Sequence, residues 1–432
     1  MLHVNSEWLL KVLQHIEIVA VTKIIEELGD MSIFRKLAVA APVLVALHAP
    51  AYAADIKVGS AGGVTGPIAE LVAAIVKGRQ IAADHINANG GLLTGDMLKL
   101  VVADSACDPK AAVDAGNKLV NVEQVVAIVG PSCSGATNGM VSSVTIPAGV
   151  TVLSDSATAP SISSLKDKDT VFRASASDAY QGAAIAGLVY KSGARKVAMT
   201  YSNDDYNAGI ANVFEREFKK LGGTITANQA HEPNKASYRA ELATLSQGGP
   251  EALALFAYYG SSGITIVKNS LDNSLFGKFY AADGMFDVSV IEQIGADNLR
   301  DRIWITQAAS DTNDASYKNF ADAYRAAGGD PEAPYAAHGY DVTFLMALAI
   351  EKAGAAERSK ISAALRAVAG PGGEVVRPGE WAKAKRLIAA GKDVNYEGAA
   401  GVNDFDANGD VTGLFSVNVV GGDGKWSRTM LK

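Results

Sequence analysis

Ala127-Ile-Val-Gly-Pro-Ser-Cys-Ser-Gly-Ala-Thr137 joins a short apolar run to a segment of small residues. The run that ends at Val129 is typical of a buried strand, and the residues from Ser134 onward are typical of a helix start. This arrangement places hydroxyls and backbone N–H groups at a helix N-terminus, where a carboxylate binds without lysine or arginine. Because Cys133 lies in the same turn, the sequence predicts a ligand-binding turn that contains a cysteine.

The two cysteines of the chain are Cys107 and Cys133, so each is the other's only intrachain partner. Export to an oxidising compartment would favour a disulfide between them. Two free, buried thiols are the alternative that the residues alone leave open.

The N-terminal region predicts such an export. Residues 31–36 end in the basic pair Arg35-Lys36, residues 37–47 are an apolar run, and Ala51-Tyr-Ala53 is a small-x-small cleavage site. This order is typical of a signal peptide cleaved near Ala53, and the apolar run is too short to span a bilayer. We therefore expect residues 31–53 to be a signal peptide and the mature chain to be periplasmic. Residues 1–30 do not fit a signal peptide, and our hypothesis is that they are a mis-assigned extension.

Composition excludes some classes of partner. The 432 residues carry a net charge of −7 and show no basic stripe, which argues against nucleic acid as a partner. The six histidines form no ligand-like pair, so we expect neither a metal nor a cofactor.

Beyond residue 54, strand-like and helix-like segments alternate through two successive halves, which predicts parallel pairing in each half. The expected strands are 56–59, 98–103, 125–129 and 150–154, then 196–201, 224–229, 252–258 and 278–281. The expected helices are 66–87, 109–121, 137–148, 180–192, 209–221, 238–247 and 264–271, followed by 316–327, 336–353, 361–369 and 378–390.

The fold class is therefore α/β, with two doubly wound parallel-sheet lobes joined by a multi-strand hinge. The late helices are expected to return and complete the first lobe, and the strand-like segment 414–419 to join the second. The predicted boundaries are 54–174 plus 306–403 for lobe 1 and 175–305 plus 404–432 for lobe 2.

Ligands of such sheets bind beyond the carboxyl ends of the strands, which here is the cleft between the lobes. In the first half, these ends carry Ser132, Ser134 and the segment 155–158. In the second half, they carry acids and aromatics, in the segments 203–206, 258–260 and 283–284. This division suits a zwitterion, because hydroxyls and amides bind a carboxylate and acidic side chains bind an ammonium group.

The chain also resembles a known family over nearly all of the predicted mature sequence. It is similar to the periplasmic branched-chain amino-acid-binding proteins of ABC transporters, the leucine/isoleucine/valine group with the type I periplasmic binding protein fold. The matching motifs are Asp104–Val113, Cys133-Ser134, Ala157–Pro160, Gln181-Gly182, Tyr206–Gly209 and Asn403–Gly409.

The resemblance implies roles for individual residues. Cys107 and Cys133 would form the family disulfide. The ligand carboxylate would be held by Ser134, Thr158 and the backbone at Ser156. The ligand ammonium would be held by Asp283, and the aromatic residues that line the cleft would be Tyr206, Tyr259 and Tyr335.

Two departures from the family pattern leave the ligand itself open. Leu71 stands where the family has an aromatic residue, and Asp283 is one methylene shorter than the family's glutamate. Each assigned residue also has an ordinary structural alternative: serine and threonine cap helices, Asp-Gly forms turns, and tyrosines pack in cores.

The resemblance implies an exported, monomeric protein that captures an amino acid, branched-chain or similarly apolar, and delivers it to an inner-membrane ABC permease. One alternative is the same fold binding another small carboxylate or an amide, such as an aromatic acid. Another is a sensory ligand-binding module. An enzyme is not expected, because no nucleophile elbow, dinucleotide fingerprint or phosphate-binding loop is found.

Overall fold

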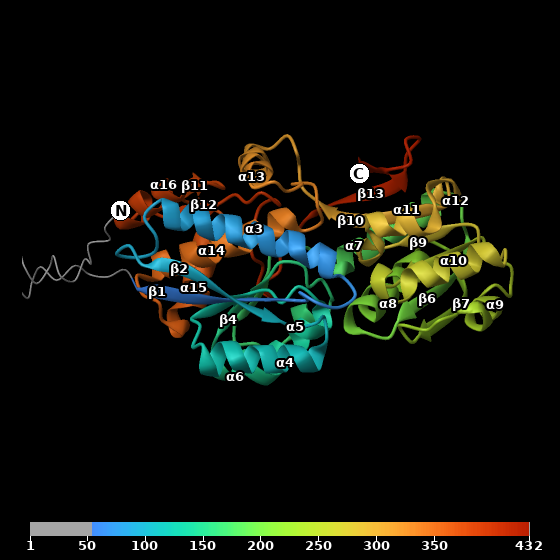
Figure 1. The fold of residues 1–432 in the computed structure, drawn as a ribbon, viewed down its shortest axis with the longest axis horizontal. Coiled ribbons are helices and arrows are strands. Elements are labelled where there is room, and N and C mark those ends of the chain that lie inside the picture. Colours follow the sequence, from blue (N-terminus) through green and yellow to red (C-terminus); the bar gives the residue numbers. More distant parts are fainter. Residues whose placement is uncertain (1–53, 432) are drawn as a thin grey trace, which may run out of the picture. The chain divides into compact units, whose positions relative to one another are not determined.

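Two main sheets form the framework of residues 54–431, the part of the chain that the computed structural model describes (Figure 1). The predicted signal peptide and the extension before it, residues 1–53, lie outside the described residues. Strands alternate with helices along both sheets, which confirms the α/β class.

The first sheet is parallel throughout and has the strand order β2-β1-β3-β4-β5. Its strands are β1 (Asp55–Gly62), β2 (Met97–Asp104), β3 (Ala127–Val129), β4 (Thr151–Ser154) and β5 (Val171–Arg173). The inner strands β3 and β4 are buried along their whole length, as expected for a sheet covered by helices on both faces.

The second sheet has the strand order β14-β13-β10-β9-β8-β6-β7, and β13 runs antiparallel to both of its neighbours, β14 and β10. Its strands are β6 (Lys196–Ser202), β7 (Thr224–His231), β8 (Ala252–Phe256), β9 (Phe279–Ala281), β10 (Ile303–Ala309), β13 (Leu414–Val420) and β14 (Trp426–Met430). The predicted strand at 414–419 is therefore the antiparallel partner of β10.

Helices cover both sheets. The first sheet carries α3 (Ala69–Ala88), α4 (Pro109–Asn117), α5 (Ser134–Met140) and α6 (Ile146–Ala148). The second carries α7 (Asp178–Lys191), α8 (Asp205–Lys220), α9 (Arg239–Leu245), α10 (Ile264–Asp272), α11 (Val288–Ile294) and α12 (Ala296–Leu299). The sequence did not predict α11 and α12. Helix α3 begins at Ala69 and not at 66, because Gly66 has a φ of 104°, which a helix cannot contain.

Four late helices return to the first sheet: α13 (Ala315–Ala326), α14 (Ala336–Ala353), α15 (Arg358–Ala369) and α16 (Trp381–Ala389). Helix α14 lies alongside α3, and residues 336–350 of it are all buried (Figure 1). A helix that is apolar around most of its circumference is expected to be enclosed in this way. A small sheet of β11 (Glu374–Val376) and β12 (Val394–Tyr396), which was not predicted, packs nearby.

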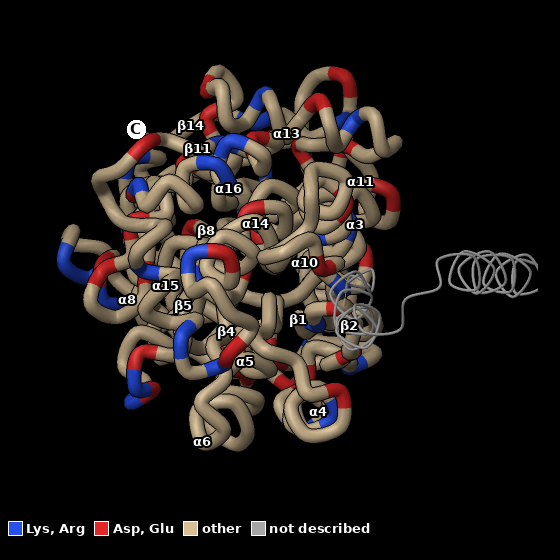
Figure 2. The backbone as a smooth tube through the Cα atoms, turned by 90° about the vertical axis from the view of Figure 1, so that its left-hand side faces the viewer, with Lys and Arg blue, Asp and Glu red and all other residues tan. Residues whose placement is uncertain are grey.

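The chain passes between the two sheets after β5, after β10 and after β12. These crossings bring the carboxyl ends of β3 and β4 to face the carboxyl ends of β8 and β9. Acidic and basic residues are interspersed on the side that Figure 2 shows. Within residues 54–431, no helix has the length and hydrophobicity that crossing a bilayer requires.

Candidate functional site

The turn after β3 is fixed by a disulfide and by hydrogen bonds. Cys107 and Cys133 are bonded, with their Cα atoms 5.4 Å apart. This confirms the disulfide and excludes the two free thiols. The Thr137 hydroxyl lies 3.1 Å from the Pro131 carbonyl oxygen and 3.0 Å from that of Cys133. The turn therefore holds Ser134, the first residue of α5, in a defined position.

Ser134 presents a hydrogen-bond donor to the cleft. Its hydroxyl oxygen accepts the backbone N–H groups of Thr158 and Ala159, each at 3.1 Å. Both acceptor positions of the hydroxyl are thus used, and its own hydrogen is left to donate. Since Ser134 lines the cavity described below, a carboxylate oxygen placed there can accept this bond.

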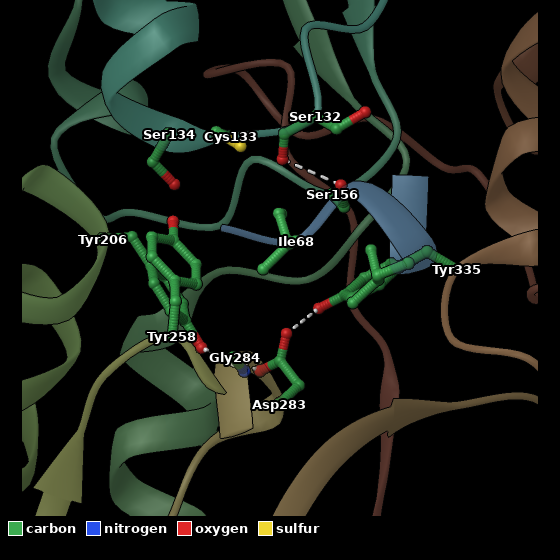
Figure 3. Close-up of a pocket in the computed structure, with 11 residues that line it drawn as sticks. Ile68, Ser132, Cys133, Ser134, Ser156, Tyr206, Tyr258, Asp283, Gly284 and Tyr335 are labelled. Atoms are coloured by element: carbon green, nitrogen blue, oxygen red, sulfur yellow. Dashed lines mark hydrogen bonds between the residues drawn. The ribbon is translucent and has the colours of Figure 1, made fainter. Parts of the chain in front are cut away.

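The other two predicted carboxylate partners are placed differently from each other. Ser156 lines the same cavity, and its hydroxyl donates to the Ser132 carbonyl oxygen at 2.8 Å (Figure 3). Its side chain thus supports the turn after β3. Thr158 is buried but does not line the cavity, and its hydroxyl has no hydrogen-bond partner among the described residues.

A buried ion pair, which sequence reasoning missed, supports this side of the cleft. Arg79, in the middle of α3, pairs with Asp155, and both side chains are fully buried. The guanidinium also donates to the hydroxyls of Ser60 and Ser132 and to the Ala61 carbonyl. One side chain thus joins the ends of β1, β3 and β4, which is what positions the serines above it.

Asp283 lies opposite the serines, in the helical turn η5 (Asp283–Met285) after β9 (Figure 3). It accepts hydrogen bonds from Gln181 at 2.7 Å, from the Tyr206 hydroxyl at 3.1 Å and from the Tyr335 hydroxyl at 2.9 Å. Burial raises the pKa of Asp283 above its usual value, while these three donors oppose the rise. The position of Asp283 is therefore fixed by side chains from three other elements.

Stacked tyrosines form one wall of the site. The rings of Tyr206 and Tyr258 lie parallel, with centroids 5.4 Å apart. Tyr258, which lies in the predicted strand-end segment 258–260 but was not assigned to the site, lines the cavity, whereas the assigned Tyr259 does not. Tyr259 begins the helical turn η4 (Tyr259–Gly263), and its ring is buried in the hydrophobic core. The signal that could have singled out Tyr258 is its place two residues after the end of the buried strand β8.

These groups surround a cavity of about 310 Å³, its open mouth included. Its polar groups gather at two opposite sides, the serines at one and Asp283 at the other, and Ile68 lies between them (Figure 3). The lining residues are Ile68, Leu71, Ser132, Cys133, Ser134, Ser156, Tyr206, Tyr258, Asp283, Gly284 and Tyr335. Such a cavity can bind a small molecule that has an acceptor at one end, a donor at the other and an apolar body. Among residues 54–431, no group of acidic, histidine or cysteine side chains could hold a metal ion.

Comparison with known proteins gives the family. Residues 78–422 match the family described as the receptor family ligand binding region. A leucine-, isoleucine-, valine-, threonine- and alanine-binding protein of Pseudomonas aeruginosa is 30% identical over 319 residues, which are 73% of this chain and 83% of the relative. This chain belongs to the branched-chain amino-acid-binding proteins of ABC transporters. An amino acid binding protein of the same organism is 29% identical over 357 residues, 81% of this chain and 92% of that relative.

Solved structures agree with this membership. The branched-chain amino acid transporter substrate binding protein LivJ from Streptococcus pneumoniae, in complex with isoleucine, is 27% identical. It aligns with a TM-score of 0.72 over 88% of this chain and 99% of its own. A leucine binding protein from Thermotoga maritima, 24% identical, has a TM-score of 0.73 over 87% of this chain and 98% of its own. A solute binding protein from R. palustris in complex with benzoate, 19% identical, has a TM-score of 0.70 over 87% and 96%. The last two likenesses show the fold, that of two-lobed periplasmic binding proteins.

Proposed function

We propose that this binding protein captures an apolar amino acid between its two lobes and delivers it to an ABC permease of the inner membrane. The observation that carries the proposal is the pairing across one cavity of Ser134, from the first sheet, with Asp283, from the second. The relatives named for leucine, isoleucine and valine support the choice of ligand. The lobe boundaries at 54–174 plus 306–403 and 175–305 plus 404–432 are part of this proposal, with β10 crossing the boundary at 306.

In this proposal, the ligand carboxylate accepts hydrogen bonds from Ser134 and from the backbone at Ser156. The ammonium group faces the acidic side, and the apolar side chain lies against Ile68, Leu71 and the ring of Tyr258. Because each lobe supplies only half of these contacts, the ligand has a higher affinity for the closed arrangement and shifts the population toward it.

We further propose that the protein is a periplasmic monomer and that its signal peptide is removed near Ala53. The Cys107–Cys133 disulfide supports an oxidising compartment. The relatives of this chain are binding proteins and not enzymes, and domain closure requires no covalent chemistry.

A thermal-shift screen of the purified protein tests this function. The twenty amino acids and a set of aromatic acids that includes benzoate are each added in excess, and stabilisation grows with concentration over Kd. We expect leucine, isoleucine or valine to give the largest rise in melting temperature, and the Asp283→Ala variant to give none. A rise with benzoate and with no amino acid would contradict the proposal and favour the aromatic-acid alternative.

A further inference from the structure

A buried histidine outside the cavity joins three neighbouring strands of the second sheet. His231 is the last residue of β7, which lies at the edge of this sheet, and it is 4% exposed. Its Nδ1 lies 2.8 Å from the Thr200 hydroxyl of β6. Its Nε2 lies 2.9 Å from the hydroxyl of Ser262, in the turn η4 that follows β8. Since β6 lies between β7 and β8, one imidazole links all three strands near their carboxyl ends.

The hydrogen bonds assign the tautomer of His231. The Thr200 hydroxyl donates its own hydrogen to the Gln229 carbonyl oxygen at 2.8 Å, so it accepts from the imidazole, and Nδ1 carries the ring hydrogen. Nε2 is then the acceptor to which the Ser262 hydroxyl donates. The opposite tautomer would leave the hydrogen of the fully buried Ser262 without an acceptor among the described residues. Burial lowers the pKa of His231 to about 4, so the ring is neutral at neutral pH and keeps this acceptor.

The anchored serine belongs to the turn that shapes one wall of the cavity. Three backbone N–H groups of η4 donate to the Tyr258 carbonyl oxygen, among them that of Ser262 at 3.3 Å. Fixing Ser262 therefore fixes the peptide that follows Tyr258, and with it the direction of the Tyr258 ring along the cavity wall (Figure 3). The same turn carries Gly260, which lies so close to the Pro67 carbonyl oxygen that a Cβ would overlap it. The turn thus forms part of the cavity and also contacts the loop before α3.

We propose that His231 is a positioning residue for ligand binding: through Ser262, its Nδ1–H tautomer holds η4 in the conformation that puts Tyr258 on the cavity wall. Neither His231 nor Ser262 lines the cavity, so their effect on affinity passes through the turn. If the turn adopts this conformation in only a fraction of the molecules, the apparent affinity falls by that fraction. This inference rests on the proposed function.

The test is isothermal titration calorimetry with L-leucine on the wild type and two variants of His231, together with the melting temperature of each protein without ligand. In His231→Gln, the amide oxygen takes the place of Nε2 and still accepts from Ser262. In His231→Asn, the amide takes the place of Nδ1, keeps the contact with Thr200 and leaves Ser262 without a partner. We expect leucine affinity to fall about tenfold or more in His231→Asn and to stay within about threefold of the wild type in His231→Gln. Both substitutions should lower the melting temperature, so a loss of stability does not by itself predict this difference.

Two further variants complete the test. Ser262→Ala removes the other partner of the same hydrogen bond, and we expect it to lose as much affinity as His231→Asn, with little further loss in the double variant. Tyr238→Phe is the control, because the buried Tyr238 ring packs edge-on against His231, with centroids 5.4 Å apart, and its hydroxyl donates to the Glu232 carbonyl oxygen at 2.9 Å. We expect Tyr238→Phe to lower the melting temperature and to leave leucine affinity unchanged.

The outcomes separate this inference from the function on which it rests. If the wild type binds leucine and His231→Asn binds equally well at a lower melting temperature, His231 has a purely structural role and the inference is wrong. Equal losses of affinity in His231→Asn and His231→Gln would also overturn it, because only the former loses the bond to Ser262. If His231→Asn does not fold, Ser262→Ala decides the question in the same way. If the wild type binds no amino acid, the proposed function fails, and the inference fails with it.

Discussion

The role of Asp283 can be tested by removing its charge while keeping its shape. Its carboxylate accepts three hydrogen bonds and has a relative exposure of 6%, so the group is almost completely desolvated. In Asp283→Asn, the remaining carbonyl oxygen can still accept from Gln181 and Tyr206, and the new amide can donate to the Tyr335 hydroxyl. The variant should therefore fold, while losing the negative charge that faces the ligand ammonium.

The expected loss of leucine affinity is about 2–4 kcal/mol, because one partner of a desolvated, hydrogen-bonded charge pair is removed. This corresponds to a rise in Kd of roughly 30- to 1,000-fold. Isothermal titration calorimetry measures it directly, and Asp322→Asn is the control, since the Asp322 side chain is 84% exposed.

The pH dependence of affinity gives a second measurement on the same variant. Burial raises the pKa of Asp283, so the wild type protonates this group and loses leucine affinity as the pH falls through that raised value. Asp283→Asn cannot titrate at this position, and we expect its affinity to fall less over the same range. A variant that binds leucine within threefold of the wild type at neutral pH would refute the reasoning.

Three further predictions concern stability and closure. Replacing Cys107 and Cys133 by serine removes a disulfide between residues 26 positions apart and should lower the free energy of unfolding by about 3 kcal/mol, as measured by urea denaturation. An unchanged denaturation midpoint would contradict this prediction. Burial raises the pKa of Asp341 to about 7. The contribution of protonated Asp341 to the free energy of unfolding is therefore present at low pH and is lost as the pH rises toward and through 7. Relative to Asp341→Asn, the free energy of unfolding of the wild type should fall by about 2 kcal/mol between pH 5.5 and 8. A difference between the two proteins that stays constant over this range would refute that pKa. A Cβ on Gly260 would overlap the backbone of the loop before α3. We therefore expect Gly260→Ala to weaken leucine binding about tenfold or more, with an unchanged melting temperature. Gly277→Ala is the control, because its Cβ meets open space and should not weaken binding. Equal affinities of these two variants would show that closure does not depend on this contact.

Local patterns predicted the first side of the site well. The strand, turn and helix around Cys133 follow one another in sequence, so their residue types predict the position of Ser134 at the helix start. The residues alone left the disulfide and two free thiols open, and the structure contains the disulfide. The second side was predicted less completely, because it depends on which of two adjacent residues faces the cavity. Tyr258 and Tyr259 differ by one position, and the helical turn that begins at Tyr259 puts the former on the cavity wall and the latter in the core.

Contacts between distant elements could not be derived from periodicity alone. Arg79 and Asp155 are 76 residues apart in sequence, and no local pattern links them. A signal was present, however: Arg79 lies on the same face of α3 as the buried residues Val72, Ile75 and Ala82. A charged residue on a buried helix face predicts a buried partner.

The central claim is that the ligand must contact both lobes through two opposite charges. Calorimetric titration of the wild type with L-leucine, 4-methylpentanoate and 3-methylbutylamine tests this directly, because the second compound lacks the ammonium group and the third lacks the carboxylate. We predict that leucine binds and that the affinity for each truncated compound is lower by about a hundredfold or more. Binding of either truncated compound with an affinity close to that of leucine would contradict the account.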